Sequence, residues 1–409
     1  MLTHLWFSFF AVSFISACYQ WLVNGQADIF SILVQSTFDM ASLSVEIAIG
    51  LIGVLALWLG FFKIAERAGM VRILSLALEP LFLKLMPDVP KNHPSHGSIT
   101  MNIAANMLGL DNAATPMGLK AMQDLQSLNP EKNTASNAQI LFLVLNTSSL
   151  TILPVTIFMY RAQQGATDPT AVFLPILMAT GASTLTGLLA VAYVQKINLL
   201  DKTIALYFAA LALILAALAS FLVTLPAEQM TATSSLLGNF LLFGVIMLFL
   251  ASGWFKKIDI YDAFIEGAKQ GFEIAIKLIP YLLAMLVAIG LLRSSGVLDG
   301  LLSLFEYFFT LIGVNTDFIQ ALPTAFMKPL SGSGARAMML ETMNTYGADS
   351  FAATVSAILQ GSTETTFYVL AVYFGSVGIK KVRHALTCAL LADFAGITTA
   401  IFAGYWFFH

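Results

Sequence analysis

Polar residues gather in the middle of two apolar stretches that are each long enough to cross a membrane. They lie at 146–151 (NTSSLT) and at 360–366 (QGSTETT), where six of the seven residues are polar. A helix that opens inside a bilayer must face protein or a water-filled cavity, because lipid offers no hydrogen bonds. The freed N–H and C=O groups can then bind a solute or an ion. We therefore expect two broken helices that line one site.

Two other polar turns each separate a pair of short apolar helices. The turn at 109–116 (GLDNAATP) has Gly, Asp and Asn for the bend and a proline that suits a first helical turn. The turn at 328–336 (KPLSGSGAR) combines two cations with a Ser-Gly-Ser-Gly run, whose backbone N–H groups can form an anion-binding nest. A carboxylate or phosphate on a substrate would fit the second tip.

The charged residues within these segments have several open roles. Glu364 could carry a proton, coordinate Na⁺, hydrogen-bond a substrate hydroxyl or neutralise Arg336. Asp393, in the last apolar stretch, could line the site or pair with a cation of the second turn. Lys328 and Arg336 could bind ligand, or they could only pair with Glu341, Glu364 or Asp393.

The candidate site residues share a position at a turn, at a helix break or on a helix facing them. Asn102 and Asn106 lie four apart on one helix face, so they could line the cavity or bond a neighbouring helix. The substrate-binding candidates are Asn106, Asn112, Thr115, Asn146, Ser148, Ser331, Ser333, Arg336, Gln360, Ser362, Thr363 and Glu364. The ion-coupling candidates are Thr147, Ser149, Glu364, Thr365 and Asp393.

The composition excludes a soluble globular domain. Of the 409 residues, 58% are hydrophobic and 11% are charged, whereas soluble domains are about 25% charged. The net charge of -3 gives no basis for nucleic-acid binding. His93 and His96 are too few for a metal site, and no phosphate-binding loop, zinc-protease or nucleophile-elbow motif occurs. We expect no enzymatic activity, cofactor or structural metal, with Na⁺ left open as a coupling ion.

The elements that position the candidate residues are transmembrane helices of about 20 apolar residues each. The predicted spans are 2–22, 45–64, 137–160, 171–194, 203–223, 234–253, 273–292, 351–374 and 384–407. Amphipathic helices are predicted at 28–44, 67–86, 257–272 and 294–311, and re-entrant hairpins at 95–128 and 317–346. The predicted fold class is therefore an all-α polytopic membrane protein with about nine transmembrane helices and two re-entrant helical hairpins.

The same order of elements occurs twice. Residues 45–82 and 272–309 are identical at 12 of 38 positions, with Glu46 matching Glu273. At an offset of 214, the two polar breaks also align. We predict a first repeat at 1–195, a linking transmembrane helix at 196–233 and a second repeat at 234–409.

The linking helix makes the two repeats inverted in topology. Each repeat has four spans, and a hairpin does not change sides, so one additional span reverses the second repeat. With the N-terminus in the cytoplasm, 14 Lys and Arg residues lie on the cytoplasmic side, while Arg161 and Arg293 flank spans outside. The C-terminus is then expected on the periplasmic or extracellular side of a bacterial cytoplasmic membrane.

The motifs resemble two spore maturation protein families. Residues 1–195 resemble spore maturation protein A in 58–60 (WLG), 63–66 (KIAE), 109–120 (GLDNAATPMGLK) and 144–148 (VLNTS). Residues 235–409 resemble spore maturation protein B in 328–332 (KPLSG), 346–351 (YGADSF), 360–366 (QGSTETT) and 372–375 (VYFG). The resemblance implies a fused form of the two, in the nucleoside-recognition or gate group. That group is similar to the core of concentrative nucleoside transporters and to the membrane part of ferrous-iron transport protein B.

A secondary transporter fits these features best. It would move a small anionic or zwitterionic solute, nucleoside-like, amino-acid-like or peptide-like, by alternating access coupled to Na⁺ or H⁺. The resemblance implies the fold and not the substrate. The alternatives are an inorganic ion permease resembling the iron-transport gate and a non-transporting membrane scaffold. Expected partners are the lipid bilayer and the solute, with no nucleic acid, and a homo-oligomer is a further expectation.

Overall fold

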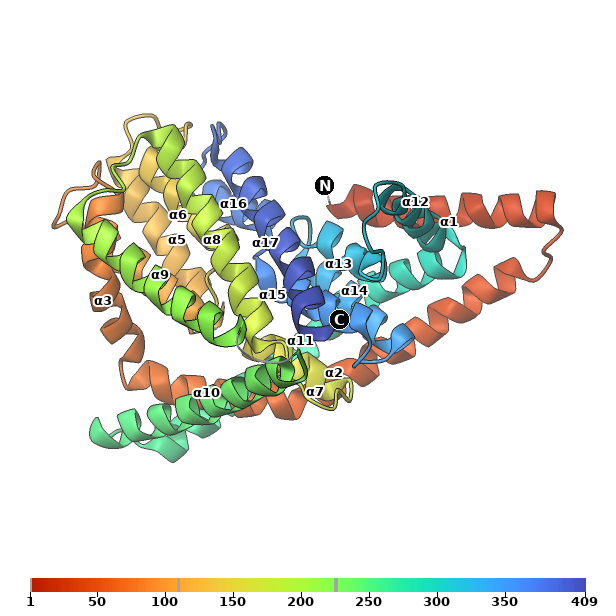
Figure 1. Ribbon diagram of the computed structural model, residues 1–409, viewed down its shortest axis with the longest axis horizontal. Helices are drawn as coiled ribbons and strands as arrows, with labels where there is room; N and C mark the ends of the chain where they lie inside the picture. The colour runs from red at the N-terminus through yellow and green to blue at the C-terminus, as the bar shows by residue number, and fades with distance from the viewer. Residues whose placement is uncertain (1, 109–110, 224–226) are drawn as a thin grey trace.

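The protein is almost entirely helical in the computed structural model, which describes residues 2–108, 111–223 and 227–409 (Figure 1). The described residues form no β-strand. The helices up to the linker are α1 (Leu2–Asn24), α2 (Ile29–Arg67), α3 (Met70–Leu85), α4 (Ser95–Met107), α5 (Asp111–Leu128), α6 (Asn137–Ser148), α7 (Val155–Gln163), α8 (Phe173–Gln195) and α9 (Lys202–Val223). They are followed by α10 (Ala227–Phe255), α11 (Ile260–Ser294), α12 (Val297–Leu311), the single 3₁₀ turn η1 (Ile319–Ala321), α13 (Leu322–Met327), α14 (Gly332–Tyr346), α15 (Phe351–Ser362), α16 (Thr366–Ser376) and α17 (Ala385–Phe408).

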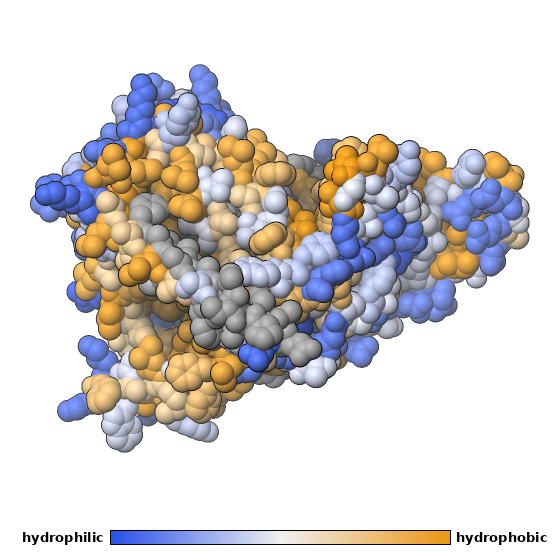
Figure 2. Space-filling view, viewed as in Figure 1, coloured by the Kyte–Doolittle hydropathy of each residue, from blue (hydrophilic) through white to orange (hydrophobic). Residues whose placement is uncertain are grey.

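Six of the described helices are long and apolar enough to cross a membrane. They are α1, α2, α8, α10, α11 and α17, and each overlaps a predicted span. Many large apolar side chains, such as Phe7 and Phe243, are exposed. Figure 2 shows apolar residues over much of one face of the molecule, with hydrophilic residues gathered mainly towards its edges. Such a surface suits contact with lipid rather than with water.

Two predicted boundaries are absent from the structure. The amphipathic stretch 28–44 and the span 45–64 form one continuous helix, α2, and 257–272 and 273–292 likewise form α11. No proline or turn sequence interrupts α2, so nothing ends it at the change from amphipathic to apolar. Its 39 residues correspond to about 58 Å at 1.5 Å per residue, well beyond a bilayer core of about 30 Å.

The helix order of α2 to α8 repeats in α11 to α17. Both α3 and α12 begin after a glycine in the left-handed region, Gly69 at φ 77° and Gly296 at φ 70°. Glycine adopts this conformation without the steric cost of a Cβ atom. Similarly, α6 and α15 begin at serine N-caps, where Ser136 and Ser350 accept bonds from the backbone N–H groups of Gln139 and Ala353. Equivalent local sequences thus start equivalent helices.

Helices α2 and α11 pack along one another and join the two halves of the chain. At Gly271 the backbones approach so closely that a Cβ atom would lie 2.5 Å from the Cα of Ala56. Small residues permit such approach between membrane helices, where van der Waals contact supplies much of the association energy. This crossing places the second half against the first.

We expect Gly271→Leu to destabilise the protein by about 1–3 kcal/mol or more, because the added side chain must force α2 and α11 apart. Gly53→Leu is the matched control on α2, because nothing lies within 4 Å of a Cβ atom at Gly53. Unfolding of the two variants in detergent, followed by circular dichroism, measures the difference. Equal stability of both variants would contradict the close crossing.

Candidate functional site

Backbone hydrogen bonds bring the four polar segments together. We call 149–154 the first break, between α6 and α7, and 363–365 the second break, between α15 and α16. The N–H of Glu364 in the second break donates to the carbonyl of Thr147, at the end of α6, over 2.8 Å. Each break is also tied to the hairpin of its own half, by Ile152 N–H to the Met107 carbonyl at 3.1 Å and by Phe367 N–H to the Pro329 carbonyl at 3.0 Å.

The local sequence explains why both helices stop at these positions. Ser149 lies in the left-handed region with φ 34°, and Pro154 precedes α7, so a helix cannot continue through this stretch. Thr363 is fully extended at φ -149° and ψ 176°. A β-branched residue favours that extended conformation over a helical one.

Helices α8 and α17, which correspond in the order of the two halves, each bond at or next to one break. The Thr180 hydroxyl on α8 donates to the Ser149 carbonyl at 2.5 Å and accepts from the Thr151 N–H at 3.3 Å. On α17, Asp393 accepts a hydrogen bond from the Thr366 hydroxyl at 2.7 Å. The first break is therefore supported by a neutral side chain and the second by a carboxylic acid.

The hairpin tips and breaks enclose one cavity of about 250 Å³. Seven predicted site residues line it: Asn106, Thr115, Asn146, Arg336, Gln360, Thr363 and Glu364. The other lining residues are Ala114, Thr151, Leu153, Pro154, Thr156, Ile157, Lys328, Gly332, Gly361, Tyr368, Val369, Val372 and Tyr373. The volume is slightly below the roughly 300–1,000 Å³ of pockets for drug-sized ligands, so a small solute would fit.

Three charged side chains line this cavity, two of them positive. The Arg336 guanidinium lies over the Tyr160 ring, 5.3 Å from its centroid, which is within range of a cation–π interaction. Glu341, one proposed partner of Arg336, instead pairs with Arg293. Among the described residues, the Glu364 side chain has neither an ion pair nor a hydrogen bond, and Arg336 has no ion pair. These two opposite charges are therefore available to a ligand.

Amide and hydroxyl groups form a second polar face of the site. Asn106 donates to the Asn146 side-chain oxygen at 2.9 Å, and the Tyr373 hydroxyl approaches the same oxygen at 3.4 Å. Asn102 donates to the carbonyl of Ala114 at 2.8 Å. Of the two asparagines with open roles, Asn106 thus both lines the cavity and bonds a neighbouring helix, whereas Asn102 joins the arms of the first hairpin.

The remaining candidates lie behind the cavity wall. Thr147, Ser148 and Ser362 each hydrogen-bond a carbonyl of their own helix, as Ser and Thr often do in membrane helices. Ser331 caps α14 through the Gly334 N–H and lies 3.3 Å from the Ser333 hydroxyl, oxygen to oxygen. The Asn112 side chain lies outside the part of the structure that is described, and the binding or coupling role of every candidate stays a prediction.

Thr365 and Ser149 belong to the breaks themselves, and Asp393 lies on α17 with 2% of its surface exposed. Sequence reasoning missed the tyrosines of α16 that line the cavity. Tyr368 and Tyr373 occur with Val369 and Val372 at a spacing that puts all four on one helix face. This spacing, immediately after the second break, was the available signal.

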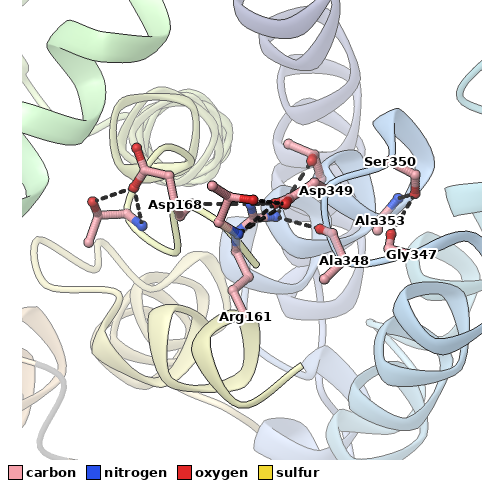
Figure 3. A network of polar contacts seen from close by, with 10 residues as sticks. Arg161, Asp168, Gly347, Ala348, Asp349, Ser350 and Ala353 are labelled. Atoms are coloured by element: carbon pink, nitrogen blue, oxygen red, sulfur yellow. Dashed lines mark hydrogen bonds and ion pairs between the residues drawn. The ribbon is translucent and has the colours of Figure 1, made fainter. Parts of the chain in front are cut away.

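Loops join the two halves at both ends of the bundle (Figure 1). At one end, the Ala135 N–H donates to the Lys381 carbonyl at 3.0 Å, and the Lys381 N–H donates to the Asn133 carbonyl at 2.9 Å. At the other end, side chains make the joint (Figure 3). There the buried Arg161 lies 3.6 Å from the Asp349 carboxylate.

Asp349 is the centre of this second joint. Its carboxylate accepts hydrogen bonds from the Thr167 N–H at 2.9 Å and the Thr167 hydroxyl at 2.5 Å. These bonds, with the nearby charge of Arg161, hold the pKa of Asp349 below its usual value. Arg161 also donates to the carbonyls of Ala348 and Asp168, so one end of α7 is fixed next to the cavity.

The described residues contain no group of three or more His, Cys, Asp and Glu side chains that could hold a metal ion.

Comparisons with known proteins show the family of the chain. The chain matches the family model Gate, described as nucleoside recognition, at residues 48–164 and 275–380, which is more than half of its length. It is 45% identical over 157 residues to spore maturation protein B of Bacillus subtilis (strain 168), covering 38% of this chain and 86% of that protein. It is 41% identical over 146 residues to spore maturation protein A of the same organism, covering 36% of this chain and 74% of that protein. No solved structure matches it significantly.

We expect acid to weaken the Asp349 joint. A carboxyl group with a lowered folded-state pKa stabilises the fold above its unfolded pKa of about 3.9 and loses that contribution as pH falls through the folded value. Thermal unfolding between pH 6 and about pH 3 should therefore depend less on pH in Asp349→Asn than in the wild type. Asp262→Asn, an exposed carboxylate on α11, is the control. An unchanged pH dependence in Asp349→Asn would contradict this role.

Proposed function

We propose that this chain, which belongs to the nucleoside-recognition (Gate) family, is a secondary active transporter of a small polar solute. Its relatives and its apolar helices make it a multi-pass membrane protein.

One observation carries the proposal: two hairpin tips and two broken helices from opposite halves of the chain line the same cavity. In membrane transporters, discontinuous helices place their free backbone groups at a midplane site between repeats. Alternating access would follow from movement of one half against the other around this cavity.

The charges of the cavity favour an anionic or zwitterionic solute. Lys328 and Arg336 supply two positive charges and Glu364 supplies one negative charge. A carboxylate or phosphate would pair with the cations, and an amino group or a hydroxyl would bond to Glu364. The tyrosine rings and amide groups around it also suit a nucleoside-like solute, in keeping with the description of the family.

The size of the cavity favours an organic solute over an inorganic ion. A volume of about 250 Å³ could hold roughly eight water molecules at about 30 Å³ each. An ion permease would instead need a narrow filter that replaces the hydration shell of its ion.

The proposed membrane arrangement has nine spans and two re-entrant hairpins in two inverted repeats. The α4–α5 and α13–α14 pairs would enter and leave the membrane on one side, and each of α6–α7 and α15–α16 would together form one span. The distribution of Lys and Arg supports a cytoplasmic N-terminus in the bacterial cytoplasmic membrane.

This arrangement predicts which sites a membrane-impermeant thiol reagent can reach in intact cells. In a variant lacking Cys18 and Cys388, a cysteine at Asp349 should be labelled from outside, whereas a cysteine at Lys132 should be labelled only after the membrane is opened. Labelling of both from outside would contradict the inverted arrangement.

We expect Glu364→Gln to reduce solute uptake at least about 100-fold, because the variant loses the negative charge in the cavity and with it about 3 kcal/mol of interaction with a bound cationic group. Uptake is measured in proteoliposomes with the solute that gives the largest thermal shift in a panel of nucleosides, amino acids, dipeptides and dicarboxylates.

Glu306→Gln, which removes an exposed carboxylate on α12, is the matched control and should keep wild-type uptake. Wild-type uptake by Glu364→Gln would remove Glu364 from the mechanism. If no solute in the panel bound or moved while one inorganic ion crossed the membrane, the ion permease would replace the transporter.

A further inference from the structure

The two breaks satisfy their oxygen atoms differently, although they occupy equivalent positions in the two halves. At the first break, hydroxyl groups of Thr180 and Thr184 donate to backbone carbonyls at 2.5 and 3.3 Å. The side-chain oxygen of Asn146 accepts from Asn106 at 2.9 Å. The Asn146 side-chain oxygen and the carbonyls of Ser148 and Ser149 are therefore bonded to protein donors.

At the second break, three buried side-chain oxygens have no hydrogen-bond partner among the described residues. They are Oε1 of Gln360, Oγ1 of Thr363 and Oδ1 of Asp393, on residues that are 7%, 4% and 2% exposed. Gln360 occupies the position equivalent to Asn146. The side-chain oxygen at this position therefore has a hydrogen-bond partner in the first half and none among the described residues in the second.

Two contacts place Asp393 and α17 beside the second break. The hydroxyl of Thr366, the first residue after the second break, donates to Asp393 at 2.7 Å. A Cβ atom at Gly396, almost one turn beyond Asp393, would lie 2.8 Å from the Thr363 side chain. Helix α17 therefore approaches the second break without a side chain in between, and Gln360 leads into that break on α15.

The chemistry of the group is that of a hard-cation site. An amide, a hydroxyl and a carboxylate offer only oxygen ligands, which suit hard cations rather than transition metals. The C-terminal end of α15 adds the negative end of its helix dipole. A buried carboxylate with one unbonded oxygen is unfavourable unless a positive charge balances it.

Lys328 currently provides positive charge in this region. It is 4% exposed and lines the cavity. The carbonyl of the next residue, Pro329, accepts from the Phe367 N–H, and Thr366, which precedes Phe367, donates to Asp393. The tip of the second hairpin therefore places Lys328 between Asp393 and the space proposed for the solute.

We propose that Gln360, Thr363 and Asp393 form a Na⁺ site, and that Lys328 competes with Na⁺ for Asp393 until an anionic group of the solute attracts the lysine into the cavity. This inference rests on the proposed function for the identity of the second ligand. Solute and Na⁺ then increase each other's affinity. The solute draws Lys328 away from Asp393, and Na⁺ replaces the positive charge that Asp393 loses. Asp393 exchanges Lys328 for Na⁺ as its positively charged partner, and this exchange couples the two ligands.

The test measures Na⁺ binding without any solute. Thermal unfolding of the full-length protein in detergent is recorded over a range of NaCl, with choline chloride keeping the ionic strength constant. Removing the competing ammonium in Lys328→Met should lower the NaCl concentration for half-maximal stabilisation at least about fivefold relative to the wild type. Asp393→Asn and the double variant Lys328→Met/Asp393→Asn should show no difference between the two salts.

Two further variants separate loss of the site from loss of the fold. Thr363→Val in the Lys328→Met background keeps every charge, removes one ligand and should raise the half-maximal concentration again. Asp39→Asn, on the exposed surface of α2, should respond to NaCl as the wild type does. Size-exclusion chromatography checks that each variant is monodisperse.

An unchanged NaCl response in Lys328→Met, or a wild-type response in Asp393→Asn, would overturn the proposal. Equal stability in NaCl and choline chloride for every variant would also overturn it and leave water or a proton as the occupant. A solute shift that is independent of Na⁺ would reject this site while keeping transport. Na⁺ binding without any solute uptake would reject transport while keeping the site.

Discussion

A backbone hydrogen bond from the Glu364 N–H to the Thr147 carbonyl joins two interrupted helices from opposite halves of the chain. Each interruption frees polar backbone groups that need hydrogen-bond partners within the protein. The two helices partly resolve this problem for each other, and the hairpins supply further partners through Met107 and Pro329. The need to satisfy these groups therefore holds two tips and two breaks around one small space, and the cavity is a consequence of that requirement.

Because the fold is duplicated, the residues of each half of the site can be compared with their counterparts in the other half. Thr180 and Asp393 support equivalent breaks, yet one is a neutral hydroxyl and the other an acid. Asn146 and Gln360 also correspond, but only Asn146 has its side-chain oxygen bonded to protein. Equivalent positions in a duplicated scaffold thus differ in their hydrogen bonding, which is the asymmetry that the proposed Na⁺ site depends on.

The helices and the segments that meet at the cavity could be predicted from apolar length and polar clusters, because both follow from the cost of exposing backbone to lipid. The continuity of α2 and α11 could not, since a change from amphipathic to apolar pattern does not end a helix. Composition also could not distinguish Glu364, which faces the cavity, from Ser148 and Ser362, which bond their own helices. That difference depends on rotation about the helix axis and on what packs behind it, which only the tertiary structure defines.

The two joints between the halves differ in how far they depend on particular side chains, and this difference affects how each joint tolerates substitution. The joint through Lys381 combines main-chain bonds, which nearly every amino acid can make, with a bond from the Arg383 side chain to the Ala135 carbonyl. The joint at Asp349 depends on particular side chains. Loss of the Asp349 carboxylate would therefore remove most of one joint, whereas loss of the Arg383 side chain would leave the main-chain bonds of the other joint in place.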